Sequence, residues 1–451
     1  MGNAEINASG ALLACLSIAA CIGACATVQG EDQGPGGGGG SGGGSGAGGS
    51  SGAGGTGSAG ATLRGTVWAP GNAPGLVPSN QEIPVHHAVI SASRNQPAPP
   101  SAGARCNPCQ TLPTLHTFSD EKGSFSISSL EAGTQWITIQ KGGFRVDIQV
   151  TLGAGETRTL TDAESTLPST EDPEAGRWLP RIAIALGQYD RLEEILGKMG
   201  LGSIDSSGAL QEGSLSDVVH IYENGSRDVG PTEGTLTELV SNPSLMLEYS
   251  LILIPGSGSA HTAALQAQTN LRNIRDYIEA GGTLYTTAWS GEWADNVFPA
   301  FVTLGDNGAD TPATAFDQNT VTWNTAQFGN ADGANYTSPA TEAVDSGLFA
   351  WLDGQIGPLV GGGTGSIDAG SFAISESWNL IVSESDTTTW VTGGAPGSEG
   401  KLPMAVSYEP VGCGRVAFSV NHATDRDVHP GLVPQERLAL YAMLALLDCQ
   451  P

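Results

Sequence analysis

Ser290, His422 and Asp425 have the residue types that nucleophilic catalysis requires. A serine hydroxyl is unreactive at neutral pH, so Ser290 would need a neighbouring base such as His422. The sequence around Ser290 departs from the nucleophile motif Gly-x-Ser-x-Gly, because Ala and Glu stand where that motif has its glycines. The alternative interpretation is that Ser290 and Gly291 form a turn, and that His422 makes a hydrogen bond at the edge of a pocket.

Four cysteines lie outside the N-terminal apolar segment, and this even number is typical of an oxidising compartment. Cys106 and Cys109 form a CxxC pair in a proline-rich loop. A metal site would need a second pair of ligands, and a thioredoxin-like redox pair would open a helix after a strand. We therefore expect a local disulfide between Cys106 and Cys109. A second disulfide, between Cys413 and Cys449, would fix the C-terminal helix to the neighbouring sheet.

The acidic segment 306–310 (Asp-Asn-Gly-Ala-Asp) has carboxylate and amide groups that could bind calcium, but it lacks the spacing of an EF-hand. Acidic loops are usually solvated, so we expect no metal ion and no cofactor. The glycine-rich segments 256–258 and 361–363 lack the lysine and the serine or threonine of a phosphate-binding loop.

Residues 62–165 contain short strands separated by turns, without a helical period. Residues 119–123 are predicted to be a turn, because Asp120 supplies a local hydrogen bond and Gly123 tolerates a positive φ. Closely spaced strands with turn signals indicate an all-β sandwich. The predicted strands are 63–68, 85–92, 124–127, 136–140, 144–152 and 157–160.

Residues 176–451 alternate between apolar strands and amphipathic helices. This alternation predicts a parallel sheet with helices on both faces, which is a three-layer α/β (flavodoxin-like) domain. Residues 305–400 are rich in Asp, Asn, Thr and Gly, and we interpret them as a loop-rich insertion that covers one end of the sheet. The predicted strands are 181–186, 218–222, 251–254, 283–287, 404–408 and 415–420, and the predicted helices are 190–199, 235–240, 263–280 and 435–447.

Motifs throughout residues 62–165 resemble the carboxypeptidase regulatory-like family. They are Gly65-Thr66-Val67, Asp120-Glu121-Lys122-Gly123-Ser124-Phe125, Leu130-x-Ala132-Gly133 and Gly142-Gly143-Phe144. The resemblance implies a transthyretin-like sandwich that usually carries no catalytic residues and serves as a spacer or an adhesion module.

The α/β region resembles the class I glutamine-amidotransferase-like fold, in particular its ThuA-like branch. The motifs are Leu253-Ile254-Pro255-Gly256, Asp276-Tyr277-Ile278-Glu279-Ala280-Gly281-Gly282 and Gly412-x-Gly414-Arg415-Val416. That family uses a cysteine nucleophile on a strained turn after a strand, with a histidine base. The resemblance puts Trp289 at the cysteine position and His422 at the histidine position, which implies that glutaminase activity is absent.

A ligand pocket is still expected at the carboxyl ends of the strands, where open α/β sheets bind ligands. On the same alignment, Trp289, Trp293 and His422 would line that pocket.

The charge of the chain excludes whole classes of partner. With 46 acidic and 18 basic residues, the formal net charge is −28. Nucleic acids need a basic footprint, and anionic headgroups repel such a surface, so neither is an expected partner. The acidic excess lies mainly after residue 165, which supports a domain boundary there.

The N-terminal residues have the pattern of a targeting signal. Residues 11–26 form an apolar run that is too short for a membrane span and typical of a signal peptide, although no Lys or Arg precedes it. Ile18-Ala19-Ala20-Cys21 resembles the lipobox of bacterial lipoproteins, with Cys25 as the alternative site. We expect a signal peptide over residues 1–25 and a lipid anchor on Cys21. Residues 26–61, mostly Gly, Ser and Ala, are expected to be a flexible tether.

Together these features predict a lipid-anchored protein of the cell envelope that lies outside the cytoplasm. Residues 62–165 would form its sandwich, and residues 176–451 its α/β domain. We expect a non-catalytic binding or envelope-structural protein, with an unidentified ligand or envelope partner. The alternative is a cell-envelope hydrolase that uses Ser290 and His422.

Overall fold

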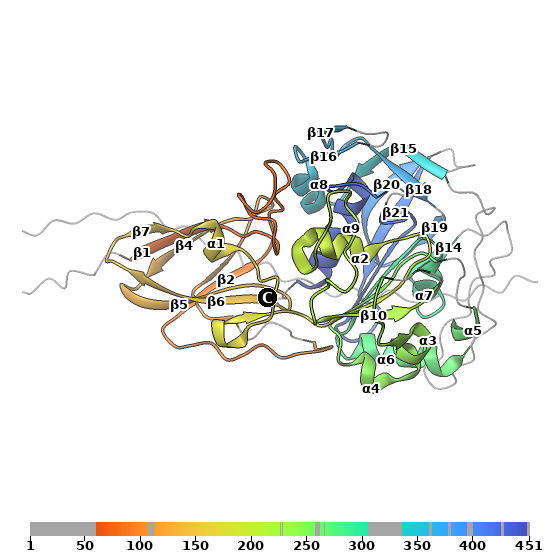
Figure 1. Ribbon diagram of the computed structural model, residues 1–451, viewed down its shortest axis with the longest axis horizontal. Coiled ribbons are helices and arrows are strands. Elements are labelled where there is room, and N and C mark those ends of the chain that lie inside the picture. Colours follow the sequence, from red (N-terminus) through yellow and green to blue (C-terminus); the bar gives the residue numbers. More distant parts are fainter. Residues whose placement is uncertain are drawn as a thin grey trace, which may run out of the picture. The chain divides into compact units, whose positions relative to one another are not determined.

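The computed structural model describes residues 60–106, 112–225, 227, 229–257, 262–265, 267–304, 336–359, 363–377, 380–394, 400–424 and 428–448. The chain is a mixed α/β protein with several sheets (Figure 1). The acylation candidates Cys21 and Cys25 and nearly all of the predicted tether lie outside these residues, as does the acidic segment 306–310. Within the described ranges, no helix is both long and apolar enough to cross a membrane.

The first part of the described chain contains two sheets. Apolar side chains of both sheets, such as Leu63 and Phe125 of one and Ile139 of the other, belong to one buried cluster. The three-stranded sheet has the order β4 (Ser124–Leu130), β1 (Ala61–Thr66), β7 (Thr157–Thr159). The five-stranded sheet has the order β3 (His116–Phe118), β2 (Val89–Ser93), β5 (Gly133–Lys141), β6 (Phe144–Leu152), β8 (Arg177–Trp178). Two short helices lie between β7 and β8 in the chain, α1 (Asp162–Ser165) and η1 (Pro173–Ala175).

The predicted turn before β4 is confirmed. The Asp120 carboxylate accepts hydrogen bonds from the backbone N–H groups of Lys122 (2.9 Å) and Ser124 (2.8 Å). Gly123 has a φ of +74°. Within β4, Phe125 and Ile127 are buried while Ser124 and Ser126 are exposed, as the period of two requires.

The second part is built on a ten-stranded sheet. Six adjacent strands are parallel: β11 (Gly234–Thr235), β10 (Val219–Glu223), β9 (Ile182–Ala185), β12 (Leu251–Ile254), β13 (Thr283–Thr287) and β22 (Arg415–Ser419). Four antiparallel strands continue the sheet: β21 (Lys401–Tyr408), β20 (Thr388–Gly394), β15 (Tyr336–Ala343) and β18 (Phe372–Ser377). β12 and β13 have the predicted bounds.

The described part of the predicted insertion extends this sheet. Its strands β15, β18 and β20 pair beyond β21, which the sequence did not predict (Figure 1). Two small pairs accompany them: β14 (Val302–Leu304) with β19 (Ile381–Glu384), and β16 (Ile356–Pro358) with β17 (Thr364–Ser366). The insertion therefore contributes to the sheet itself.

Helices lie on both faces of the parallel strands. On β22, the Arg415 guanidinium donates to the carbonyl of Ala445 in α9, whereas the Phe418 ring lies against Gly291, next to α7. Residues three apart on a strand face opposite sides. The helices are α2 (Leu192–Leu196), η2 (Gly197–Leu201), α3 (Leu236–Ser241), α4 (Pro243–Met246), α5 (Thr262–Leu265), α6 (Gln268–Glu279), η3 (Ala288–Gly291), α7 (Glu292–Asp295), α8 (Ser346–Leu352) and α9 (Pro434–Leu446).

The β5–β6 turn packs against the end of α9. Lys141 is fully buried, and its ammonium donates to the His86 carbonyl (2.9 Å) and to the Asp448 carboxylate. Burial lowers the pKa of Lys141, although Asp448 opposes the shift. Gly142 has a φ of +56°, and a Cβ there would lie 2.4 Å from the Leu447 carbonyl oxygen, so only glycine fits this approach.

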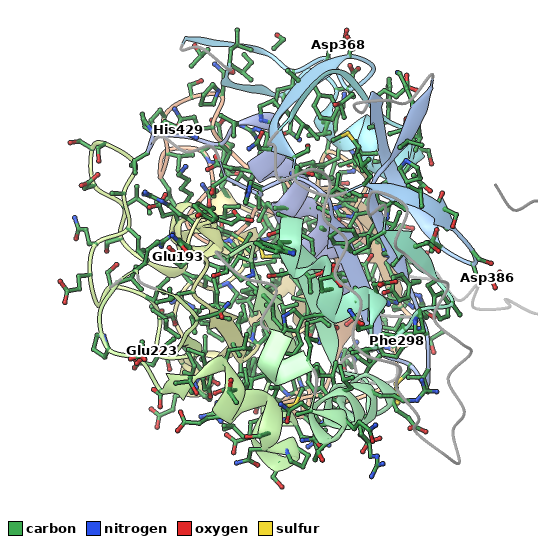
Figure 2. All side chains as sticks on the ribbon, turned by 90° about the vertical axis from the view of Figure 1, so that its right-hand side faces the viewer. Glu193, Glu223, Phe298, Asp368, Asp386 and His429 are labelled. Carbon is green, nitrogen blue, oxygen red and sulfur yellow. A yellow bond between two sulfur atoms is a disulfide. The ribbon has the colours of Figure 1, made fainter. Side chains whose placement is uncertain are left out.

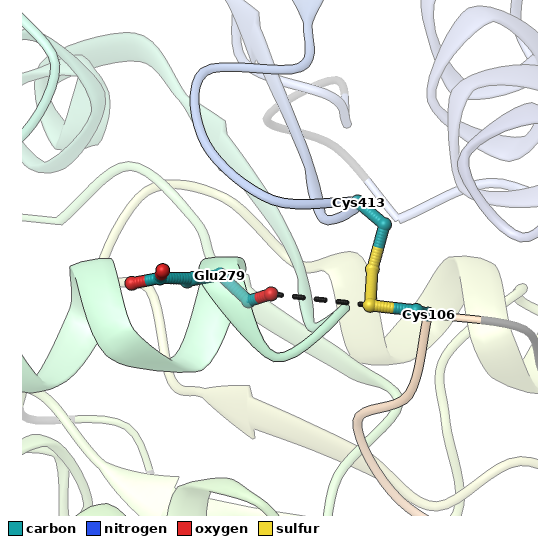
Figure 3. Close-up of a disulfide and its surroundings, with 3 residues drawn as sticks. All are labelled: Cys106, Glu279 and Cys413. Carbon is teal, nitrogen blue, oxygen red and sulfur yellow. Dashed lines mark hydrogen bonds between the residues drawn. A yellow bond between two sulfur atoms is a disulfide. The ribbon is translucent and has the colours of Figure 1, made fainter.

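The disulfide pairing differs from both pairings predicted from the sequence. Cys106 is bonded to Cys413, 307 residues away, so the Cys106–Cys109 and Cys413–Cys449 predictions are wrong (Figure 3). Cys109 and Cys449 themselves lie outside the described residues. The bonded sulfur of Cys106 lies 4.0 Å from the Glu279 carbonyl oxygen at the end of α6.

Close backbone packing explains the pairing. A Cβ at Gly281 would lie 2.2 Å from the Arg105 carbonyl carbon, and one at Gly412 would lie 2.3 Å from the Glu279 carbonyl oxygen. The end of α6 therefore contacts both segments that carry the bonded cysteines. Local spacing such as CxxC carries no information about a contact of this kind.

The first prediction concerns this disulfide. Replacing Cys106 and Cys413 together by Ser should lower the free energy of unfolding by about 3–5 kcal/mol, because a very long loop is released in the unfolded chain. Urea denaturation measures the loss. A non-reducing peptide map that links Cys106 to Cys109 would contradict the pairing.

Candidate functional site

The candidate site lies where the parallel strands β9, β12, β13 and β22 end at one edge of the sheet. The residues that follow these strands are Asp190, Gly256, Ala288 and His422. All four are buried. Because neighbouring parallel strands end side by side, residues far apart in the sequence meet here.

Ala288 occupies a strained backbone position at the end of β13. Its φ is +47°, in the left-handed region that non-glycine residues rarely adopt, at a cost of order 1–3 kcal/mol. A sharp turn of this kind after a strand is where α/β enzymes present a nucleophile. The resemblance described above puts Trp289 at the nucleophile position. In the structure, the residue with the left-handed backbone is Ala288, one position earlier in the sequence. The side chain at the turn is a methyl group, which has no nucleophilic atom.

Gly256, Ala288 and His422 converge on one point. A Cβ built on Gly256 would lie 2.9 Å from the Ala288 Cβ, and 3.0 Å from both Cε1 and Nδ1 of His422. Only glycine fits such an approach. The structure therefore brings His422 next to the turn, in agreement with its predicted place after β22.

The His422 ring is only 4% exposed. The Tyr189 ring packs edge-on against it, with centroids 6.2 Å apart and planes at 70°. Tyr189 is 51% exposed, so it forms the solvent-facing side of this pair. A ligand that reaches His422 from this side must contact Tyr189 first.

Ser290 is not arranged as a nucleophile. It is fully buried, and its hydroxyl donates to the Pro255 carbonyl at 2.8 Å. A hydroxyl has one proton to donate, so in this arrangement Ser290 does not also donate to a base. This supports the alternative interpretation, in which Ser290 serves the turn. Asp425, the third member of the predicted set, lies outside the described residues.

The two tryptophans predicted to line the pocket differ in burial. Trp293 in α7 is fully buried, while Trp289 in η3 is half-buried. Trp293 therefore presents no surface to solvent in this conformation. Trp289, one residue after the strained turn, is the better placed of the two to contact a ligand.

Asp190 is the residue at this site that the sequence analysis missed. It is fully buried. Its carboxylate accepts five hydrogen bonds: from Arg191 N (3.0 Å), Ala423 N (2.9 Å), Thr424 N (3.1 Å), the Thr424 hydroxyl (3.1 Å) and the Thr287 hydroxyl. The Thr287 hydroxyl in turn accepts from Gly256 N at 2.9 Å. One carboxylate thus connects the ends of β9, β12, β13 and β22.

The sequence gives one weak indication that Asp190 belongs to a site. Asp190 follows a predicted buried strand at its carboxyl end, where polar residues at a functional edge are expected. The sequence alone does not show whether an acidic residue at this place is solvated or buried. The five donors, which come from three separate segments, become visible only when the strands are assembled.

A buried ion pair lies beside Asp190. Arg227 pairs with Glu193 of α2, a fully buried residue labelled in Figure 2, and Arg227 also donates to the Asp190 carbonyl at 3.3 Å. Burial, together with the nearby Arg191 charge, lowers the pKa of Arg227 to about 10. Over the described ranges, no cluster of three or more His, Cys, Asp or Glu side chains has the arrangement of a metal site.

Comparisons with known proteins add little. No protein-family model matches the chain, and no curated protein matches it. Among solved structures, the chain is similar to the cytoplasmic protein STM3548 from Salmonella typhimurium, with 13% sequence identity. The alignment covers 49% of this chain and 80% of that one, with a TM-score of 0.28. At these values the likeness supports no conclusion about function.

The second prediction concerns Asp190. In Asp190→Asn, an amide N–H₂ replaces an acceptor oxygen and faces backbone donors, so the free energy of unfolding should fall by about 2–4 kcal/mol. Chemical denaturation measures it. Asp205→Asn is the matched control, because Asp205 accepts three hydrogen bonds at an exposed turn and its loss should be much smaller. Equal losses in the two variants would contradict the role of Asp190.

Proposed function

We propose that the α/β region binds a ligand at the carboxyl edge of its parallel strands, without covalent catalysis. The observation that carries this proposal is the Ala288 methyl group at the strained turn beside His422. A nucleophile at that position is the usual reason to maintain a costly backbone conformation. Here the conformation is present and the nucleophile is not.

The sheet order supports a ligand site at this edge. The central strands run β10-β9-β12-β13-β22, so the chain moves outward from β9 to β10 and then returns to add β12 on the other side. This is the order of flavodoxin-like sheets, and we propose that fold for the parallel part. Ligands of such sheets bind at the point where the order reverses, which is here between β9 and β12.

Side chains at this reversal point suit binding. Tyr189 follows β9 and is half exposed, and Ser257 follows β12, with its hydroxyl donating to the Asn224 carbonyl at 2.9 Å. A Cβ on Gly187 would lie 2.6 Å from the Gly256 carbonyl oxygen, so glycines let the two strand ends approach closely. Tyr189 and Trp289 offer aromatic surface to a ligand, and the buried Asp190 cluster holds the edge rigid.

We also propose the cellular setting that the sequence indicates. The two smaller sheets would form a transthyretin-like sandwich that acts as a spacer, and the tether of residues 26–61 would lead to a lipid anchor at Cys21. The Cys106–Cys413 disulfide supports an oxidising compartment outside the cytoplasm. Intact-mass analysis of membrane-extracted protein tests the anchor, since an unmodified N-terminus would remove this part of the proposal.

The third prediction separates binding from hydrolysis. A serine-directed fluorophosphonate probe should leave Ser290 unlabelled, because its hydroxyl is buried and donates to Pro255. Ser290→Ala should cost about 1 kcal/mol of stability, the usual worth of one neutral hydrogen bond, and leave ligand affinity unchanged. Stoichiometric labelling of Ser290 that disappears in His422→Ala would establish the hydrolase instead.

A thermal-shift screen of small molecules on the full chain tests binding itself. Compounds that bind at the strand ends and raise the melting temperature should lose their effect in Tyr189→Ala. They should keep it in Phe349→Ala, a matched control at an exposed aromatic residue of α8. Shifts that survive Tyr189→Ala would place the binding site elsewhere.

A further inference from the structure

The five-stranded sheet of the first part has an unusual outer face. Register places Ser91 opposite Thr138, and Gln140 opposite Arg145, so these four side chains share one face. The alternate residues, such as Ile90 and Ile139, point into the apolar core. An outer sheet face is normally polar and solvated. Here it is polar and buried, with exposures of 6% for Ser91, 8% for Thr138, 5% for Gln140 and 1% for Arg145.

A cavity of about 200 Å³ lies over this face. Its floor is formed by the strand residues, and segments on either side of the disulfide loop, at Gln96 and Pro97 and at Leu112 and Pro113, line its rim. It is smaller than the roughly 300–1,000 Å³ of sites for drug-sized ligands. A ligand that fills it has about the size of one sugar ring.

Arg145 presents a hydrogen-bond donor group to this cavity. Its Nε and Nη2 donate to the two Asp147 oxygens at 2.9 and 2.7 Å, and the guanidinium lies 5.0 Å from the Trp178 ring centroid. The Thr138 hydroxyl also donates to Asp147, at 2.6 Å. These contacts fix the guanidinium plane. The two N–H groups of Nη1 have no hydrogen-bond partner among the described residues, although the side chain is almost fully buried and lines the cavity.

The chemistry of the lining defines the ligand. Asp147 neutralises Arg145, and no other charged side chain lines the cavity among the described residues. The required ligand is neutral, carries oxygen acceptors for Nη1, and exchanges hydrogen bonds with Ser91 and Ser93. Hydroxyl groups both donate and accept, so they match this set.

The cavity also has apolar surface at Val89, Pro97 and Leu112. A hydroxylated ring has C–H groups that pack on such surface while its rim hydroxyls bond to polar side chains. We propose that this cavity binds a neutral polyhydroxylated ring of monosaccharide size, held by Arg145. The site is in the first part of the chain, so it is distinct from the strand-end site proposed above.

Calorimetric titration of the full chain with glucose, galactose, mannose, myo-inositol and sodium acetate tests the proposal. At least one of the four polyols should bind saturably with a dissociation constant of order 1 mM, the scale for a ligand of about a dozen heavy atoms. Acetate, the probe for an anion site, should not bind. Saturable binding of acetate alone, or no binding of any polyol, would overturn the proposal.

Two variants locate the binding. Ser93→Leu fills the cavity from the half-buried end of β2, and Asn95→Trp closes its rim from an exposed loop, where folding is not at risk. Each should weaken polyol binding at least ten-fold. Ser126→Leu, the same change as Ser93→Leu at an exposed position of β4, is the matched control and should bind as the parent does. Unchanged binding in Asn95→Trp would show that the polyol binds elsewhere and refute the assignment.

Discussion

The buried carboxylate of Asp190 is the constraint on which the strand-end site depends. An ionised carboxylate removed from water is strongly unfavourable unless donors replace the lost solvent. Three segments supply these donors: the start of α2 through Arg191, the end of β13 through Thr287, and the loop after β22 through Ala423 and Thr424. Removing any one of these donors would leave the buried carboxylate with one hydrogen bond fewer to replace its lost hydration. The strand ends are therefore held in one arrangement.

The arrangement explains why strain persists at Ala288. A left-handed alanine would relax if its neighbours allowed it, but Thr287 is bonded to Asp190, and Ser290 is bonded to Pro255. Both sides of the turn are thus tied to other strand ends. The same arrangement leaves room only for a glycine at position 256, where a Cβ would meet both the Ala288 methyl group and the His422 ring. The side chain at the centre of this edge is the Ala288 methyl group, and both sides of its turn are hydrogen-bonded to other strand ends.

The sequence predicted the parts of the fold that local pattern determines. β12 is a short apolar run that ends before Pro-Gly, and β13 begins directly after Gly-Gly. The ends of both strands were predicted at the residues where they occur. His422 was expected just after the strand predicted at 415–420, and it follows β22 there. The strained residue was placed one position late, because alanine has no left-handed preference that a sequence could reveal.

Features that depend on distant contacts could not be read from the sequence. The partner of Cys106 is set by how two loops pack on the end of α6, and the nearby Cys109 was a misleading signal. Asp190 is indistinguishable by type from a solvated carboxylate. The polar outer face of the five-stranded sheet looks in sequence like an ordinary solvent-facing alternation, because the loop that covers it is recognised only in the assembled structure.

We propose that Ala288 occupies the position of a nucleophile whose base would be His422. The most direct test is a thiolate titration of Ala288→Cys, recorded as the ultraviolet difference from the parent. If Ala288 occupies that position, the thiol pKa should lie below the ordinary value of about 8.5, because the protonated His422 ring stabilises the thiolate, and it should return to or above that value in the double variant with His422→Ala. A thiol pKa at or above the ordinary value that does not change with His422→Ala would contradict this assignment.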